Sequence, residues 1–213
     1  MEQGMTVPVR PERRAAAARC KMYGLFSRLF SYPSGERAGP ILDGSLFREM
    51  RDAAAGLPYA STLAAQPWPA VPTRADELEA GYCALFDATR PKGGAASLNE
   101  KDHVEIERSQ LWEELLRFYD HFGLDFSTER VGEFPDHLVA ELDFVHYLAF
   151  LEAGTEADGD DFARARQDFL ARHLAAWVPS LADKLSKADP ASPYTAFSGL
   201  LRAFLAEEEK AAA

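Results

Sequence analysis

Cysteine and uninterrupted apolar stretches are both scarce in this sequence. The 213 residues include only Cys20 and Cys83, and neither lies in a CxxC pair or a disulfide-dense pattern, so we expect reduced thiols and a cytosolic protein. The longest interval without a charged residue, residues 53–73, contains four prolines, which a membrane-spanning helix would not carry together. No apolar run of the signal-peptide type follows the N-terminal arginines. The sequence therefore predicts no membrane segment.

Basic residues are scarce in the second half of the chain. Residues 1–51 hold nine Lys/Arg against five Asp/Glu, and the other 162 residues carry a net charge of −15. Between Arg130 and Arg164 there is no Lys or Arg, but there are nine acidic residues. So acidic a body argues against nucleic acid as a partner, because that binding depends on neutralising phosphates with a basic surface. The negative charge favours a cationic peptide as the binding partner.

Motifs of common enzymes are also missing. The sequence contains no GxSxG nucleophile elbow and no GxxxxGK[ST] phosphate loop. Two pairs, Glu100 with His103 and Asp143 with His146, have the (i, i+3) spacing by which helix bundles bind paired metal ions. An all-α metal-binding enzyme that uses these four residues therefore stays open as the alternative hypothesis.

Alternating strand patterns are absent, whereas helical periodicity recurs along the whole chain. We expect an all-α, single-domain multi-helix bundle, with a flexible tail at residues 1–10 and a helical domain at residues 11–210. Apolar spacing and turn residues predict the bounds of the helices. The helix that begins at Phe162 is expected to end at Pro179. The predicted ranges are about 11–30, 46–57, 74–87, 103–122, 135–151 and 162–178, with a last helix from Pro193.

The stretch Glu133–Leu151, EFPDHLVAELDFVHYLAFL, organises the rest of the chain. Pro135 and Asp136 suit the first turn of a helix, because Pro has no N–H to lose and the carboxylate faces the positive end of the helix dipole. The following residues are apolar on most sides, which predicts a buried helix. On it His137 and Glu141 sit one turn apart on the same face. Polar groups on so apolar a helix are the candidates for function.

A second candidate is the aromatic stripe Tyr82, Leu85 and Phe86 at helical spacing. Such a stripe is core by default, but it can also line a groove for a partner helix or a signal peptide. Periodicity does not separate the two interpretations.

These two stretches resemble motifs of a known family. Glu133-Phe-Pro-Asp-His-Leu followed by Glu141-Leu-Asp-Phe is similar to the E-x-P-D-H loop and helix of the redox-enzyme maturation chaperones typified by TorD, DmsD and NarJ. Tyr82-Cys-Ala-Leu-Phe86 resembles the aromatic-x-x-Leu-Phe motif of that family. The segment 86–124 looks closer to the NarJ-like branch, which serves type II enzymes of the dimethyl sulfoxide reductase family. In contrast to TorD and DmsD, Asp87-Ala88 follows the Leu-Phe pair instead of Gly-Pro.

The resemblance implies a TorD-like fold and a non-catalytic function without cofactor or metal. The protein would bind the cofactor-free catalytic subunit of a type II molybdoenzyme, through its N-terminal segment or twin-arginine signal, and release it after molybdenum cofactor insertion. It would act as a monomer or a domain-swapped dimer. The resemblance also implies a client-binding site with a polar part, an apolar part and a proline that fixes the loop: Glu133, Asp136, His137 and Glu141; Tyr82, Leu85 and Phe86; and Pro135.

Overall fold

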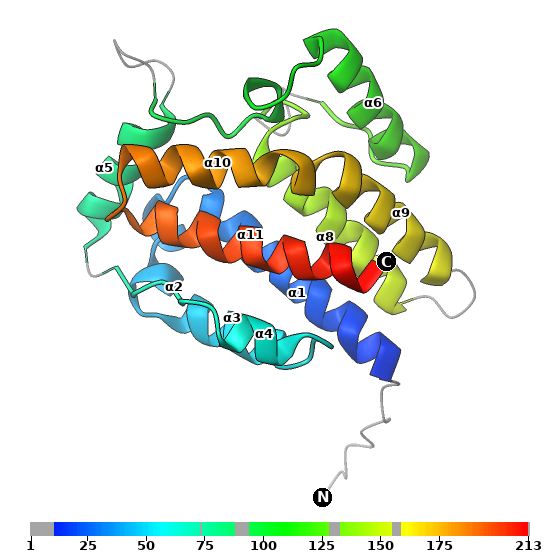
Figure 1. Ribbon diagram of the computed structural model, residues 1–213, viewed down its shortest axis with the longest axis horizontal. Coiled ribbons are helices and arrows are strands. Elements are labelled where there is room, and N and C mark those ends of the chain that lie inside the picture. Colours follow the sequence, from blue (N-terminus) through cyan, green and yellow to red (C-terminus); the bar gives the residue numbers. More distant parts are fainter. Residues whose placement is uncertain (1–10, 73, 88–93, 128–132, 155–158, 213) are drawn as a thin grey trace, which may run out of the picture.

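Figure 1 shows the computed structural model, which describes residues 11–72, 74–87, 94–127, 133–154 and 159–212. Over these ranges the chain forms helices and no strand, apart from an isolated antiparallel bridge between Asn99 and His137. The predicted all-α class is therefore confirmed. The predicted tail at residues 1–10 lies outside the described residues, and the extent of the domain, 11–210, stays a prediction.

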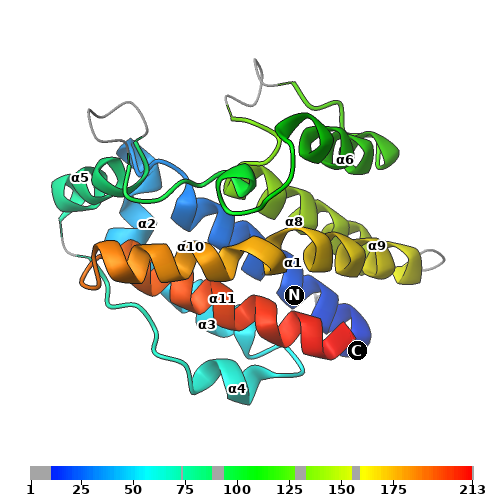
Figure 2. The same cartoon turned by 45° about the horizontal axis from the view of Figure 1, so that its top comes forward.

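Five long helices build the body of the molecule. Helix α1 packs along α8, α8 packs against α9, and α10 packs against α11, so that the C-terminal helices cover the central pair (Figures 1 and 2). Helix α8 lies inside because its apolar residues surround it, and eight of its side chains are buried. The bounds are α1 Pro11–Phe30, α8 Leu138–Gly154, α9 Gly159–Arg172, α10 Leu174–Ala188 and α11 Pro193–Ala212.

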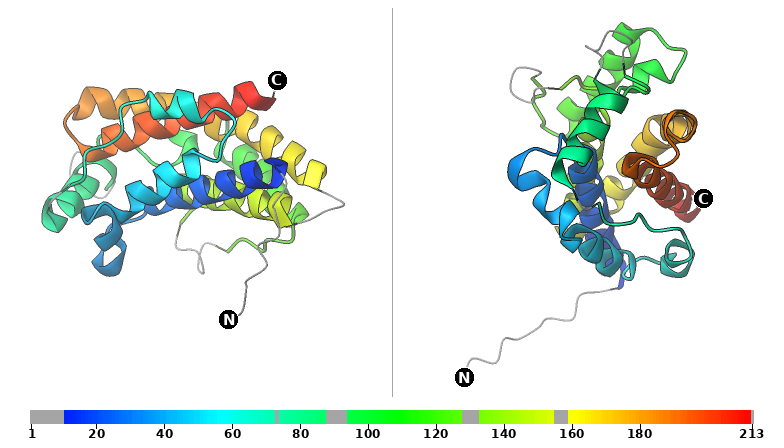
Figure 3. Two further views of the ribbon diagram at one scale, coloured as in Figure 1. Left: turned by 90° about the horizontal axis from the view of Figure 1, so that it is seen from below. Right: turned by 90° about the vertical axis from the view of Figure 1, so that its left-hand side faces the viewer.

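Shorter elements flank this body. Helix α3 packs on α1, and α5 and α6 lie at the periphery (Figures 1 and 3). None of the helices in the described ranges combines the length and the apolar character needed to cross a membrane. The bounds are η1 Gly35–Arg37, α2 Gly39–Leu42, α3 Ser45–Ala54, α4 Ala60–Ala64, α5 Ala75–Phe86, η2 Glu100–Asp102 and α6 Arg108–His121.

Two predicted helices differ from the observed ones. The helix expected from His103 begins only at Arg108, because the residues before it are tied to another loop: the Glu100 N–H donates to the Asp136 carbonyl at 2.8 Å. In place of the single helix expected to end at Pro179 there are two helices, α9 and α10. They are separated at His173, whose backbone is not helical (φ −116°, ψ −96°). Pro179 lies inside α10, where a proline removes one backbone hydrogen bond.

Candidate functional site

The loop 133–137 precedes α8 and is fastened to a distant segment by its backbone. Glu100 N donates to the Asp136 carbonyl at 2.8 Å, and Leu138 N donates to the Leu98 carbonyl, also at 2.8 Å. Pro135 and Asp136 therefore lie just before the helix and not in its first turn, since α8 begins at Leu138. The bridge holds the backbone of this loop at Asp136 and Leu138.

Asp136 is buried, with 1% of its surface exposed. Its Oδ1 accepts a hydrogen bond from Trp112 Nε1 at 2.7 Å, and its Oδ2 accepts one from the Lys101 backbone N–H at 3.2 Å. A carboxylate with both oxygens engaged in this way connects α6 and η2 to the loop. Asp136 thus holds the loop in place, and its side chain is not exposed on the surface.

Pro135 is buried as well, and its carbonyl oxygen accepts a hydrogen bond from the Tyr119 hydroxyl at 2.7 Å. Burial raises the pKa of Tyr119 well above its ordinary value, so this hydroxyl keeps its proton and remains a donor. The contact holds α6 to the loop on a second side.

His137 is buried and uncharged. Its Nδ1 accepts a hydrogen bond from the Val139 N–H at 3.3 Å, and the carboxylate of Glu133 lies 3.6 Å from its Nε2. Burial lowers the pKa of His137 to about 4, since the half-exposed Glu133 does not offset the loss of solvent. The side chain therefore is neutral at pH 7.

Glu141 belongs to a buried acidic cluster under the loop. Its Oε2 accepts a hydrogen bond from Trp177 Nε1 at 3.0 Å, and its Oε1 has no hydrogen-bond partner. Beside it, Glu100 contacts His173 Nδ1 at 2.9 Å. Burial and the nearby carboxylate of Glu100 raise the pKa of Glu141 well above its ordinary value. We define the acidic cluster as Glu100, Asp136, Glu141 and His173.

The exposed part of this region is aromatic. Phe134 is 45% exposed and stacks on Trp112 with ring centroids 5.2 Å apart. The Arg108 guanidinium lies over the Trp112 ring, 5.7 Å from its centroid. The sequence-based prediction missed Phe134 and Trp112. The signal for Phe134 was its place inside the motif, next to residues that turn inward.

The aromatic motif lies near this loop. Tyr82 and Phe86 are partly buried, with ring centroids 5.0 Å apart, whereas Leu85 is a core residue. Burial, and then the carboxylate of Glu133, raise the pKa of the Tyr82 hydroxyl. The third neighbour is Tyr32, which is 42% exposed and stands edge-on to Tyr82 at 5.3 Å.

A glycine explains how the next loop approaches this motif. A Cβ on Gly94 would lie only 2.5 Å from the Leu85 carbonyl oxygen, which also accepts a hydrogen bond from the Ala96 N–H at 2.9 Å. Only a residue without a side chain allows this approach. The end of α5 therefore supports the segment that leads to Leu98 and the backbone bridge.

The residues of the metal hypothesis do not come together. Glu100 turns toward α10, whereas His103 Nε2 bonds a backbone carbonyl at 2.9 Å. His146 Nδ1 bonds the Cys20 carbonyl at 2.7 Å, on the side of α1. In the part of the chain that the structure describes, no group of three or more His, Cys, Asp or Glu side chains is placed to hold a metal ion.

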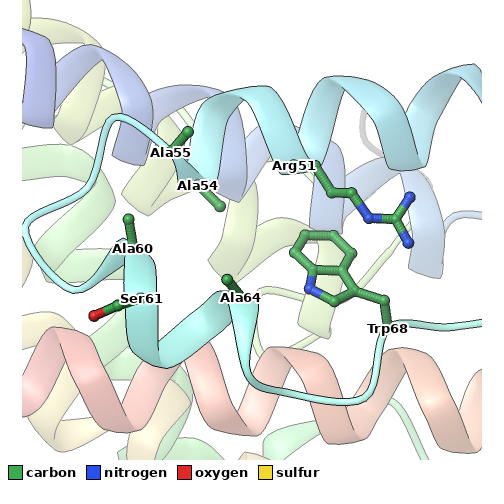
Figure 4. Close-up of a pocket in the computed structure, with 7 residues that line it drawn as sticks. All are labelled: Arg51, Ala54, Ala55, Ala60, Ser61, Ala64 and Trp68. Carbon is green, nitrogen blue, oxygen red and sulfur yellow. The ribbon is translucent and has the colours of Figure 1, made fainter.

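Figure 4 shows a pocket of about 380 Å³ between α3 and α4. Alanines line most of it. Its charged residue, Arg51, lies over the Trp68 ring at 4.8 Å, and the Trp68 Nε1 donates to the Leu63 carbonyl at 3.2 Å. Its lining offers no acid–base pair and no base that could activate the Ser61 hydroxyl, so the candidate site is the region around the loop 133–137.

The helical fold is similar to that of a solved structure. A solved structure described as a putative redox enzyme maturation protein from Archaeoglobus fulgidus covers 96% of this chain, and the match spans 99% of that structure with a TM-score of 0.51. At 19% identity this likeness establishes the shared fold. Residues 44–183 match the model of the nitrate reductase delta subunit family, and the chain belongs to that family. The predicted family is thereby confirmed.

The chain is also similar to proteins that are named as chaperones. The chain is 38% identical to the dimethyl sulfide dehydrogenase assembly chaperone protein of Rhodovulum sulfidophilum over 81% of this chain and 70% of the relative. It is 40% identical to the selenate reductase assembly chaperone protein of Thauera selenatis over 54% of this chain. That match spans 61% of the relative, less than two thirds of its length. Chaperone protein TorD of Vibrio cholerae is 29% identical over 62% of this chain and 61% of the relative.

Proposed function

We propose that this protein is a cytosolic assembly chaperone, not an enzyme, that binds the cofactor-free catalytic subunit of a type II molybdoenzyme. It holds the N-terminal or signal segment of that subunit and releases it after the molybdenum cofactor is inserted. The names of its relatives support this class of function, because they are assembly chaperones of dimethyl sulfide dehydrogenase and of selenate, chlorate and perchlorate reductases.

One observation supports the proposal: both sequence motifs are fastened to the segment 96–98. The Leu85 carbonyl accepts a hydrogen bond from the Ala96 N–H at 2.9 Å, and the Leu98 carbonyl accepts one from the Leu138 N–H at 2.8 Å. The partly buried rings of Tyr82 and Phe86 and the exposed Glu133 therefore belong to two elements that one short segment connects. Aromatic faces and a carboxylate together suit a peptide that combines apolar and cationic side chains. The acidic interval around α8 adds to this preference.

The predicted site residues then divide into two roles. Glu133, Tyr82 and Phe86 contact the client, with Phe134 as an addition. The buried predicted residues position that surface without touching the client. These are Pro135, Asp136, His137, Glu141 and Leu85.

Co-purification tests the proposal. We would express this chain with the tagged catalytic subunit of a molybdoenzyme encoded nearby on the same genome, and compare the wild type with Phe134→Ser and Glu133→Lys. Both variants alter exposed side chains, so the fold should persist and the client should be lost. Leu116→Ser is the matched control, because Leu116 is also an exposed hydrophobic residue, at 39%. Retention of the subunit by all three variants contradicts the site, and no binding by the wild type contradicts the function.

A further inference from the structure

The pocket between α3 and α4 is open and mostly apolar (Figure 4). Four of its seven lining residues are alanines, so the hollow lies where longer side chains would otherwise fill the space. Ala55 and Ala60 lie at one end of it, and Arg51 and Trp68 lie at the other. The two ends are about 6 Å apart along α3, since Arg51 and Ala55 are separated by four residues. A hollow of this size and lining suits a short apolar segment of chain.

The charged residue of the pocket, Arg51, is available to a partner. Its side chain is exposed at the edge of the hollow and lies over the Trp68 ring. Among the residues that the structure describes, no carboxylate is paired with this guanidinium. A cation at the edge of an apolar hollow is complementary to an apolar segment that carries one acidic side chain.

The pocket lies beside the start of α1. Gly56 directly follows Ala55 in the chain, and a Cβ on Gly56 would lie 4.0 Å from the Arg14 carbonyl oxygen. Helix α1 begins at Pro11, which is about 5 Å along the axis from Arg14. Ten residues of the sequence precede Pro11, and an extended chain of that length spans about 35 Å. Residues 1–10 therefore reach the whole pocket.

The composition of residues 1–10, MEQGMTVPVR, matches the chemistry of the pocket. They contain a single acidic residue, Glu2. Met5, Val7 and Val9 are spaced two residues apart, which puts them on one side of an extended backbone. The proline between the two valines favours an extended conformation for the residue before it. The segment thus offers one apolar edge and, towards its beginning, one carboxylate.

We propose that residues 1–10 bind in the α3–α4 pocket of their own chain, with their apolar edge on the alanines and Glu2 paired with Arg51. The order along the chain agrees with this placement. The apolar residues are nearer to α1, as the alanine end of the pocket is, whereas Glu2 and Arg51 both lie further from the start of that helix. Because the segment is attached beside the pocket, its effective concentration there is about millimolar, so weak contacts suffice to hold it. The contact connects α4 to the start of α1, and it does not depend on the proposed function.

Photo-cross-linking of the purified full-length chain, without any client, tests the location. We would introduce p-benzoylphenylalanine in place of Val7 and identify the cross-linked peptides by mass spectrometry after digestion with trypsin. We expect cross-links to residues 52–74, the tryptic peptide that holds every pocket residue except Arg51. The product should migrate as a monomer. The same probe in place of Leu116, exposed on α6, is the control and should not reach that peptide.

The other results overturn the inference. A cross-linked dimer would identify a second copy of the chain as the occupant of the pocket. Cross-links from position 7 that avoid residues 52–74, or no cross-link at all, would mean that the segment does not bind there. Since no client is present, each of these results leaves the proposed function standing.

Charge exchange distinguishes binding from mere proximity. Arg51→Glu should lower the yield of the cross-link about fivefold, because it replaces an attraction to Glu2 with a repulsion. Glu2→Arg combined with Arg51→Glu restores opposite charges and should restore the yield. Lys187→Glu makes the same change in net charge at an exposed position of α10 and should leave the yield unchanged. Equal yields from all of these variants would show that the segment is only tethered near the pocket, which overturns the inference.

Discussion

Two buried polar clusters connect the helices of this protein, and they differ in charge balance. The balanced cluster consists of Arg19, Glu152, Arg166 and Glu208, two cations with two anions. The acidic cluster, defined above, contains three carboxylates and one imidazole. The balanced cluster lies among α1, α8, α9 and α11, whereas the acidic cluster lies directly under the candidate site.

The balanced cluster satisfies its central group. Glu208 accepts hydrogen bonds from Arg19 Nε at 2.8 Å, Arg166 Nη1 at 2.6 Å and the Tyr23 hydroxyl at 2.7 Å, and also from Tyr59. Burial raises the pKa of its carboxyl, but the two guanidinium groups outweigh burial and hold the pKa below its ordinary value. Such a cluster stays ionised and acts as a permanent connection.

The acidic cluster has no such compensation. Glu141 Oε1 and His173 Nε2 have no hydrogen-bond partner, and the raised pKa of Glu141 means that it keeps its proton where an exposed glutamate would not. Charge pairing therefore stabilises the body of the bundle, whereas the region behind the site contains a glutamate, Glu141, that is favoured in its protonated form. The two clusters should therefore respond to pH in opposite directions: the lowered pKa of Glu208 costs stability as the pH falls below about 4.5, whereas the raised pKa of Glu141 costs stability as the pH rises above about 4.5.

The largest effect should come from unbalancing the balanced cluster. Glu208→Ala leaves Arg166 buried with one fewer anion, and breaking a buried pair in this way costs about 3–5 kcal/mol. Urea unfolding followed by far-UV circular dichroism measures the loss. Glu209→Ala, on an exposed position next to it, should change stability by less than about 0.5 kcal/mol. A loss as small as that of the control would show that pairing does not secure the body.

The next largest effect concerns the acid side of the pH profile. His137 has a folded pKa of about 4 against an ordinary value of 6.5, so in this window the unfolded state binds a proton that the folded state does not. The contribution of His137 to stability should fall as the pH decreases from 6.5 to about 4, by about 3 kcal/mol in total. His137→Asn retains an acceptor for the Val139 N–H and should remove this slope.

Unfolding free energies measured across that pH range test the expectation. His121→Asn is the control, because His121 is exposed at the end of α6. If the slope persists in His137→Asn, the acid sensitivity arises elsewhere in the molecule.

A smaller effect should follow from Asp136→Ala. The change removes the acceptor of Trp112 Nε1 and of the Lys101 N–H, which should cost about 1–3 kcal/mol. Loosening of α6 should also alter the tryptophan fluorescence near the site and weaken client binding. Asp136→Asn restores one acceptor oxygen and should recover part of both properties. Equal client loss in the two variants, without a change in stability, would instead place Asp136 in direct contact with the client.

The sequence predicted most of the fold, because apolar periodicity and turn residues are local signals. The helix from Pro193 and the one that ends at Phe86 occur as expected. The break at His173 was not predictable in the same way. At this break His173 Nδ1 lies 2.9 Å from a carboxylate oxygen of Glu100, 73 residues away, and no local pattern indicates such a contact.

The sequence predicts where in the chain the candidate site lies, but not which of its side chains are exposed. The motif predicts that the loop 133–137 belongs to the site, which stays a prediction, but a motif does not tell which side chains face solvent. Asp136 turned inward because Trp112 and Lys101 offer it donors, and that left Phe134 outside. The contacts that decide this arrangement come from α6 and η2, distant in sequence. Only the folded chain therefore separates positioning residues from contact residues.

The smallest effect, and the sharpest test of the comparison, comes from Glu141→Gln. Since the folded pKa of Glu141 is raised, the unfolded state loses its proton first as the pH rises above about 4.5, and the wild type loses stability relative to a chain without this group. Glutamine can still accept from Trp177 Nε1 but does not ionise. The variant should therefore gain about 1 kcal/mol over the wild type for each pH unit in this window.

The equivalent change in the balanced cluster, Glu152→Gln, should destabilise the protein instead, because it removes an anion that Arg166 needs. Opposite signs for these two substitutions, measured by urea unfolding at several pH values, would establish that the clusters work by different means, and equal signs would remove the distinction.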